Sequence, residues 1–230
     1  MVVSNPAVSS TTGWPVGFWA SEFIHPWHAF TEAGYSCTLS SPKGGAVELD
    51  GYSDPRDPSG YSAHDILSLG FLSTPKLAAM LEDTPSVANL RMEDFDAIVV
   101  CGGQGPMFTF RETTVLQKLF MDFYLAGKPA AALCHGTSLL LYLENPDGTP
   151  FLAGKTVTGF ANSEEAFADK TVGMKVMPYR IQDEADRLGA NFLTVGAFKP
   201  FAIRDGNLIT GQQQNSGAET ARLVIEALGK

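Results

Sequence analysis

The pattern of apolar and polar positions switches between two periods along the chain. Short runs that are almost entirely apolar, such as residues 96–101 and 130–133, are typical of strands buried on both faces. Segments with apolar residues three and four positions apart, such as 114–126 and 216–228, are typical of amphipathic helices. Because such strands and helices alternate, we predict an α/β fold with a mostly parallel sheet sandwiched by helices.

The same patterns, bounded by turn residues, predict the remaining elements. These are strands at 2–4, 35–41, 155–158, 192–195, 201–203 and 207–210, and helices at 22–33, 75–81, 86–90 and 179–188. We expect residues 192–195 to pair with 201–203, and Asp205-Gly206 to form a tight turn into the next strand. Pro26 is expected near the start of its helix, where the missing N–H of a proline is tolerated.

Residues 46–90 interrupt this alternation. Two Asp-Pro pairs and one Ser-Gly pair fall within residues 54–60, and each is a turn signal. The segment is too long for a simple connection, and long segments of this kind often have a functional role. We therefore predict a single domain over residues 1–230, with an insertion at about 46–90 that covers the rim of the active site.

One stretch combines structural and chemical signals. The apolar run 130–133 leads directly into Cys134-His135-Gly136, and an apolar helical pattern follows at once. This order predicts a nucleophile elbow, in which a tight turn pushes Cys134 out of the sheet and Gly136 lets the helix pass close to the strand. A thiol at a helix N-terminus is also favoured as a thiolate. The alternative is a buried, inert cysteine, but the adjacent His and Gly favour the elbow.

Composition and charge exclude several other classes of protein. A hydrophobic content of 44% with 18% charged residues is typical of a globular protein, and a net charge of −9 argues against a nucleic-acid partner. The three cysteines lack close spacing, which favours a reducing compartment, and no CxxC or HExxH motif predicts a metal site. There is no apolar run long enough for a membrane span and no signal-peptide pattern, so we expect a cytoplasmic protein.

The loops at the carboxyl ends of parallel strands form the usual ligand-binding edge of such a sheet. One of these loops is Gly102-Gly103-Gln104-Gly105, and another begins at the candidate nucleophile Cys134. Backbone N–H groups without obstructing side chains are what an oxyanion hole requires. The alternative for these glycines is a tight turn that only needs a positive φ.

Acidic residues and a histidine supply candidate proton carriers. Glu22 lies in an aromatic segment, where burial would raise its pKa and let it bond to the thiolate or act as a base; the alternative is an exposed carboxylate on a helix. His135 is the usual kind of proton carrier near neutral pH. Glu164 or Glu165 could orient His135 as the third member of a Cys–His–acid set, or could serve as first-turn acids of the following helix.

Motifs spread over nearly the whole chain carry a family resemblance. They are Gly17-Phe18 with Glu22 and His25-Pro26, Ala33-Gly34-Tyr35, Ser41-Pro42-Lys43-Gly44-Gly45, Gly102-Gly103-Gln104-Gly105, Ala132-Leu133-Cys134-His135-Gly136, Thr158-Gly159-Phe160, Asn162-Ser163-Glu164-Glu165 and Asp205-Gly206-Asn207-Leu208-Ile209-Thr210-Gly211-Gln212. On these motifs the sequence resembles the ThiJ/PfpI superfamily, part of the class I glutamine amidotransferase-like group with a flavodoxin-like fold. Within it, the sequence is most similar to the branch of heat-shock-protein-like glyoxalase III enzymes.

The resemblance implies Cys134 as nucleophile, His135 as its neighbour, Glu22 as protonated acid or base and Glu165 as the acidic partner. It also implies a homodimer, a small aldehyde substrate and no cofactor. Two departures affect the expected substrate rather than the nucleophile. Gln104 stands where the family usually has His, and the dipeptide at 213–214 is Gln-Gln where the family usually has Asn-Pro.

Three functions compete at this stage. The first is a glyoxalase that converts methylglyoxal to lactate through a hemithioacetal and an enediol. The second is another hydrolase or hydratase using the same cysteine, such as a peptidase, a deglycase or an isonitrile hydratase. The third is a redox sensor or a stress chaperone in which Cys134 is oxidised. A glutamine amidotransferase proper is disfavoured, because 230 residues leave no room for a synthetase domain.

Overall fold

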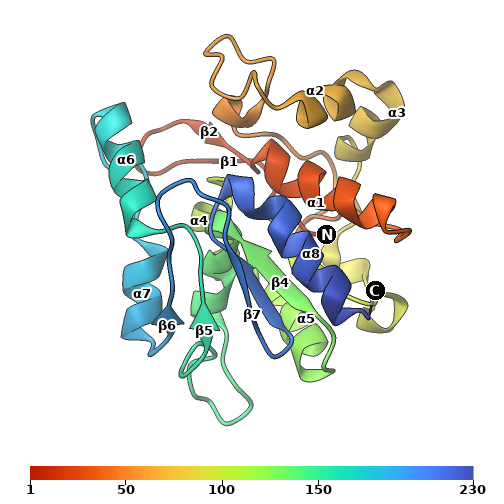
Figure 1. Cartoon of the computed structure of the whole chain (residues 1–230), viewed down its shortest axis with the longest axis vertical. Helices are drawn as coiled ribbons and strands as arrows, with labels where there is room; N and C mark the ends of the chain where they lie inside the picture. Colours follow the sequence, from red (N-terminus) through yellow and green to blue (C-terminus); the bar gives the residue numbers. More distant parts are fainter. Residues whose placement is uncertain (230) are drawn as a thin grey trace.

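A mainly parallel sheet lies at the centre of the computed structural model, which describes residues 1–229 (Figure 1). The strand order is β3 (Ile98–Val100), β4 (Ala130–Leu133), β8 (Leu208–Gly211) and β7 (Ala202–Asp205). The first three strands are parallel, and β7 runs antiparallel to β8. The hairpin between β7 and β8 turns where the sequence predicted it, and the expected α/β sandwich with a mostly parallel sheet is confirmed.

The first two predicted strands extend this sheet only as single residue pairs. Val2 pairs in parallel with Val100 on one side and with Ser40 on the other. Pro6 and Pro42 follow these pairs closely, and a proline cannot donate to a strand ladder. The sheet edge next to β3 is therefore built from pieces too short to count as regular strands.

Helices cover both faces of the sheet and create two separate cores. α1 (Ala20–Glu32) and α8 (Gly217–Ala227) pack together on one face, and α5 (Thr114–Leu125) lies on the other (Figure 1). Because successive strand residues point to opposite faces, each strand contributes to both cores. Val99, Ala131, Leu133 and Ile209 face α1 and α8, whereas Ile98, Val100, Ala130, Ala132 and Leu208 face α5.

Two small strand pairs flank the main sheet and differ from the sequence-based expectation. β5 (Thr156–Val157) pairs in parallel with β6 (Asn191–Phe192), so residues 192–195 do not pair with 201–203 as predicted. A parallel pair needs a long crossover, and the helices α6 (Asn162–Val172) and α7 (Ile181–Arg187) provide it, while β7 is already paired with β8. The predicted N-terminal loop contains a short antiparallel hairpin of β1 (Ala7–Val8) and β2 (Pro15–Val16).

The remaining helices are short. They are α2 (Ile66–Ser73), α3 (Pro75–Ala78) and α4 (Pro106–Thr109), with 3₁₀ turns at Gly51–Ser53, Ala79–Leu81, Val87–Asn89, Met92–Asp94, Phe110–Glu112 and Gln214–Ser216. Within the insertion, α2 packs against α1. Across residues 1–229, no helix combines the length and the apolar composition that a membrane crossing requires.

Pro26 lies inside α1 rather than near its start, because the helix begins earlier than the apolar pattern indicated. An internal proline removes one helical hydrogen bond. Its ring packs against α8 at Gly217, where an added Cβ would stand only 3.0 Å from Pro26 Cδ. Gly217 thus lets α8 approach α1 closely at this proline.

Candidate active site

Cys134 sits at the carboxyl end of the central strand β4 in a strained conformation. Its φ is 54°, in the left-handed region that costs a non-glycine residue on the order of 1–3 kcal/mol. The next turn of chain passes so close to β3 that a Cβ on Gly136 would lie 2.7 Å from Val100 O. This is the geometry of the elbow that the sequence predicted, and it turns the thiol away from the sheet.

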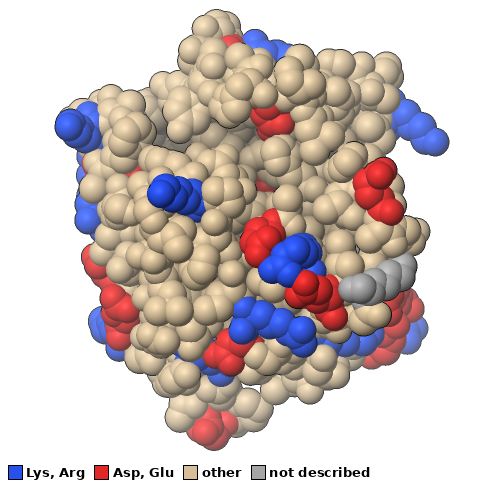
Figure 2. All heavy atoms as spheres, in the orientation of Figure 1, with Lys and Arg blue, Asp and Glu red and all other residues tan. Residues whose placement is uncertain are grey.

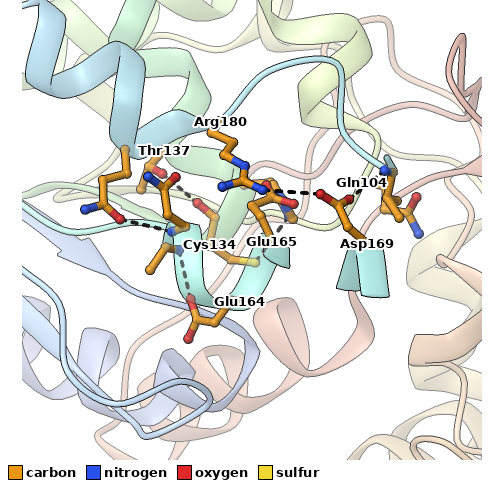
Figure 3. A network of polar contacts seen from close by, with 12 residues as sticks. Gln104, Cys134, Thr137, Glu164, Glu165, Asp169 and Arg180 are labelled. Carbon is orange, nitrogen blue, oxygen red and sulfur yellow. Dashed lines mark hydrogen bonds and ion pairs between the residues drawn. The ribbon is translucent and has the colours of Figure 1, made fainter. Parts of the chain in front are cut away.

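The helix that follows the elbow is a 3₁₀ helix over Cys134–Tyr142 rather than an α-helix. The tighter winding brings Thr137 Oγ1 to 2.6 Å from Cys134 O, to which it donates a hydrogen bond (Figure 3). The apolar pattern correctly predicted a buried helical segment here, but it does not distinguish the two windings.

His135 and Glu165 form a hydrogen-bonded chain that begins at the thiol. Cys134 Sγ lies 3.6 Å from His135 Nδ1, and His135 Nε2 lies 3.0 Å from Glu165 Oε1. The imidazole also stacks on Phe160 with ring centroids 4.1 Å apart. A carboxylate accepts hydrogen bonds, so Nε2 is the protonated nitrogen and Nδ1 is left as an acceptor facing the sulfur. The structure thus places Glu165, at the start of α6, against His135.

Glu22 enters the same site from the first turn of α1 and is completely buried. Its Oε2 accepts a hydrogen bond from Gly102 N at 2.8 Å, Oε1 has no hydrogen-bond partner among the described residues, and the carboxyl interacts with the Cys134 thiol. Burial is the main reason why the pKa of Glu22 rises to about 8. The carboxyl is therefore mostly protonated at neutral pH, and the exposed alternative for Glu22 is excluded.

The thiol of Cys134 is tuned by opposing influences. Burial, followed by the nearby charge of Glu22, raises its pKa, whereas the backbone N–H of His135 lowers it. Two adjacent buried anions are unfavourable. A thiolate therefore forms most readily while Glu22 keeps its proton, and the proton from sulfur has an acceptor in His135 Nδ1.

The raised pKa of Glu22 predicts a pH-dependent stability. Between about pH 4.5 and pH 8 the unfolded chain releases this proton while the folded chain keeps it. The free energy of unfolding therefore falls as pH rises through this window, by about 1.4 kcal/mol per pH unit from this group. We expect Glu22→Gln, which stays neutral, to lose this part of the slope.

Chemical denaturation of both proteins at pH 5 and pH 8 measures the effect. Glu32→Gln, an exposed site on the same helix, is the matched control and should keep the wild-type slope. Equal pH slopes for wild type and Glu22→Gln would show that Glu22 ionises normally.

Most amides of the glycine-rich loop at 102–105 are already used within the protein. The acceptors are Glu22 Oε2 for Gly102 N, Asp50 Oδ2 for Gln104 N at 2.6 Å and Gly17 O for Gly105 N at 2.8 Å. Gly103 N has no acceptor among residues 1–229, and Gly103 lines the cavity next to Cys134. The oxyanion role of this loop stays a prediction, and the amide available for it is that of Gly103.

Gln104 also lines the cavity, through its side chain. The Gln104 Oε1 atom is buried without a hydrogen-bond partner among the described residues. A primary amide can both donate and accept. Gln104 is therefore a further candidate for holding a polar group of a ligand.

Asp50 is a site residue that sequence reasoning missed. It is fully buried and accepts hydrogen bonds from Gly17 N at 2.9 Å and from Gln104 N, so it joins two loops of the site. Burial raises its pKa to about 6. Asp50 lies within the segment that reads as loop-like, and the only local signal is the Asp50-Gly51 turn pair, which occurs widely on protein surfaces.

A cavity of about 380 Å³ opens above Cys134 and His135. Its wall is largely aromatic, and sequence reasoning did not single out these residues: Trp14, Trp19, Tyr52, Tyr61, Phe167 and Phe198. They come from the β1–β2 hairpin, α1 and its lead-in, the insertion, α6 and the loop before β7. In the view of Figure 2, the upper part of the molecule, where the insertion and α6 lie, carries mainly uncharged side chains.

Glu164 has a structural task that differs from that of Glu165. Its Oε2 accepts from Ala161 N at 2.8 Å, and its Oε1 accepts from Phe198 N at 3.0 Å and Gln212 Nε2 at 2.8 Å. These bonds use both oxygens of Glu164 and attach it to the loop that carries Phe198.

The Gln-Gln dipeptide supports the same loop. Gln213 Nε2 donates to Lys199 O at 2.9 Å, and Gln214 lines the cavity. Both positions at which the sequence departs from the family pattern therefore lie at the cavity: Gln104 and Gln214 line it, and Gln213 supports a loop beside it.

Other charged groups near the site are paired elsewhere. Arg180 lies 3.4 Å from Asp169 and does not line the cavity (Figure 3). His25 pairs with Asp65 at 2.9 Å. Within residues 1–229, no group of three or more His, Cys, Asp or Glu side chains is arranged to hold a metal ion.

The fold and this site define an α/β protein with a cysteine elbow, a histidine–glutamate chain and a buried carboxyl beside the thiol. The chain belongs to the DJ-1/PfpI family, whose pattern it matches over residues 16–227. This confirms the family resemblance read from the motifs.

Named relatives are similar over nearly the full chain. Glyoxalase 3 of Candida albicans is 26% identical over 94% of this chain and 91% of the relative. A glutathione-independent glyoxalase of Saccharomyces cerevisiae is 28% identical over the same shares of the two chains. The crystal structure of glyoxalase III from Candida albicans superposes with a TM-score of 0.81 at 25% identity, over 98% of this chain and 95% of that one.

Proposed function

We propose that the protein is a glutathione-independent glyoxalase that converts 2-oxoaldehydes such as methylglyoxal to 2-hydroxy acids such as lactate without a cofactor. The names of the relatives support this activity. The observation that carries the proposal is a thiol and a proton acceptor that line one cavity, with a protonated carboxyl buried directly behind the thiol.

In the first step, Cys134 attacks the aldehyde carbon. The thiol proton passes to His135 Nδ1, and Glu165 holds the resulting imidazolium through Nε2. A new S–C bond forms while the aldehyde C=O bond becomes a C–O single bond, and the oxygen takes the proton back from the imidazolium of His135 to give a hemithioacetal. Gly103 N is the backbone donor available to this oxygen.

In the second step, a proton moves between adjacent carbons. A base removes the hydrogen from the former aldehyde carbon to give an enediol, and protonation of the neighbouring carbon then gives a thioester. Glu22, with its pKa of about 8, can work in both directions near neutral pH. Water finally cleaves the thioester, so the net change is the addition of one water molecule to the 2-oxoaldehyde.

The deciding experiment supplies purified, metal-free protein with methylglyoxal and no glutathione, and measures lactate. Formation of lactate at a rate above that without enzyme supports the proposal. Absence of lactate, with the protein shown to be folded by circular dichroism, would overturn it.

The same site predicts where peroxide reacts first. Cys134 lines the cavity and has a proton acceptor at 3.6 Å, so mild peroxide should oxidise it before the other two cysteines. Cys101 is buried directly after β3 and Cys37 is half-buried in a segment without regular strand structure, and neither of them lines the cavity above Cys134. Peptide mass spectrometry after a peroxide titration reads the order. Earlier oxidation of Cys37 or Cys101 would contradict the assignment of the reactive thiol.

Assembly and location follow from the same reasoning. We propose a cytoplasmic homodimer of a single domain, because two-fold dimers are the commonest assemblies and the three cysteines lack the close spacing of a disulfide framework. Sedimentation at micromolar concentration tests the dimer.

We also propose that the insertion covers the rim of the site, supported by the position of Tyr52 and Tyr61 in the cavity wall.

A further inference from the structure

The cavity is larger and more apolar than methylglyoxal requires. Its volume of about 380 Å³ falls in the range of about 300–1,000 Å³ that accommodates drug-sized ligands. Methylglyoxal carries only one methyl group beside its two carbonyls. Among residues 1–229, no lysine or arginine lines the cavity, so it offers no cationic partner to an anionic substituent.

Exposure separates the floor of the cavity from its mouth. Cys134 and His135 at the floor are 2% and 5% exposed. Tyr52, Tyr61 and Phe167 in the wall are 44%, 45% and 50% exposed. A substrate that reacts with the thiol and extends toward solvent therefore passes between aromatic side chains.

The aromatic rings of the wall form two groups, and the rings within each group are in contact. On one side Trp14, Tyr52, Tyr61 and Trp19 make a chain of successive ring contacts at 6.2, 5.9 and 6.0 Å. A second group consists of Phe167 and Phe198, whose rings meet edge to face at 5.1 Å. Such rings favour contact with a further aromatic ring in edge-to-face or offset geometry.

The second group is held rigidly. Phe198 has a φ of 59°, which is rare for a side chain of this size. Glu164 Oε1 accepts from its backbone N at 3.0 Å, and Asn215 Nδ2 donates to its backbone O at 2.9 Å. A strained aromatic residue fixed on both sides of its backbone is suited to shaping a binding surface.

We propose that the cavity selects 2-oxoaldehydes whose substituent is a bulky apolar group, above all an aromatic ring, in preference to methylglyoxal. This inference rests on the proposed function and names its substrate class. The reactive carbons bind at Cys134, and the ring occupies the space between Phe167–Phe198 and the Trp14–Trp19 group. The chemistry is unchanged, because the proton moves between the two carbonyl carbons and not from the substituent.

The test compares phenylglyoxal with methylglyoxal as substrates of the full chain, with mandelate and lactate as the measured products. We expect kcat/KM for phenylglyoxal to be at least about tenfold higher, because even one methylene in an apolar pocket changes kcat/KM by about 10-fold or more. A ratio of one or below would overturn the inference while leaving the glyoxalase activity intact.

Two variants test whether the aromatic wall of the cavity determines the ratio of kcat/KM for phenylglyoxal to that for methylglyoxal. Phe167→Ala, at a half-exposed position where folding is not at risk, should lower the phenylglyoxal-to-methylglyoxal ratio about five- to tenfold. Leu125→Ala, an exposed apolar residue on α5 that does not line the cavity, is the control and should leave the ratio unchanged. A ratio that Phe167→Ala does not change would overturn the inference.

A binding measurement separates the inference from the proposed function. Calorimetry with acetophenone, a neutral aryl ketone, and with acetone as its methyl counterpart needs no turnover. Tighter binding of acetophenone, weakened by Phe167→Ala, supports the aromatic preference even if neither 2-oxoaldehyde is converted, in which case the glyoxalase proposal alone fails. Equal binding of the two ketones would overturn the preference.

Discussion

Cys134→Ser is expected to lose methylglyoxal turnover by at least about a thousandfold. A serine hydroxyl is far less acidic than a thiol, and loss of an activated nucleophile removes the covalent route altogether. Lactate formation at matched protein concentration measures the loss. The φ of 54° at this position is equally strained for serine, so the variant should retain the fold.

Cys37→Ser is the matched control, because Cys37 lies outside the cavity and should not affect turnover. Turnover by Cys134→Ser within tenfold of wild type would show that the reaction does not proceed through a thiohemiacetal at this residue.

Glu22→Gln is expected to lower kcat by about two to four orders of magnitude, the usual contribution of a general acid–base group. Glutamine can still hydrogen-bond to the sulfur, but it cannot take a proton from the hemithioacetal carbon. The pKa of about 8 places Glu22 near the ideal range for this role at neutral pH. Steady-state turnover of methylglyoxal gives the direct measurement.

The pH profile of Cys134 alkylation separates two ways in which Glu22 could act. If Glu22 only tunes the thiol, the profile shifts and turnover largely survives. If it carries the proton between carbons, turnover falls even at the pH where alkylation is restored. Near-wild-type turnover would remove Glu22 from the proton relay and leave His135 as the candidate base. Glu32→Gln, exposed on the same helix, again serves as control.

Local patterns predicted the centre of the molecule well. Strands β3 and β4 are apolar throughout because both faces are buried, and the run into Cys134-His135-Gly136 has no simpler structural explanation than an elbow. The choice between Glu164 and Glu165 could not be made from their residue types. It is decided by the direction of each side chain at the start of α6, where successive residues point about 100° apart.

Contacts between residues far apart in the sequence could not be predicted from local sequence patterns. Asp50 reaches the site only because the insertion folds back on the loop of Gln104, a contact between residues 54 positions apart. The pairing of β6 with β5 likewise depends on the route of the chain through α6 and α7. The aromatic wall is assembled from surface segments whose residues carry no periodic signal.

The floor and the aromatic wall of the cavity come largely from different parts of the chain, with α6 and the start of α1 contributing to both. The thiol, the imidazole and their carboxyl partners are anchored to the central strands and the first turns of α1 and α6. Most of the wall comes from a hairpin, an insertion and a loop, which tolerate sequence change better than buried strands do. Substitution in these segments can therefore alter which aldehydes enter without disturbing the reacting groups, so the protein offers a fixed chemistry on which new substrate ranges can evolve or be engineered.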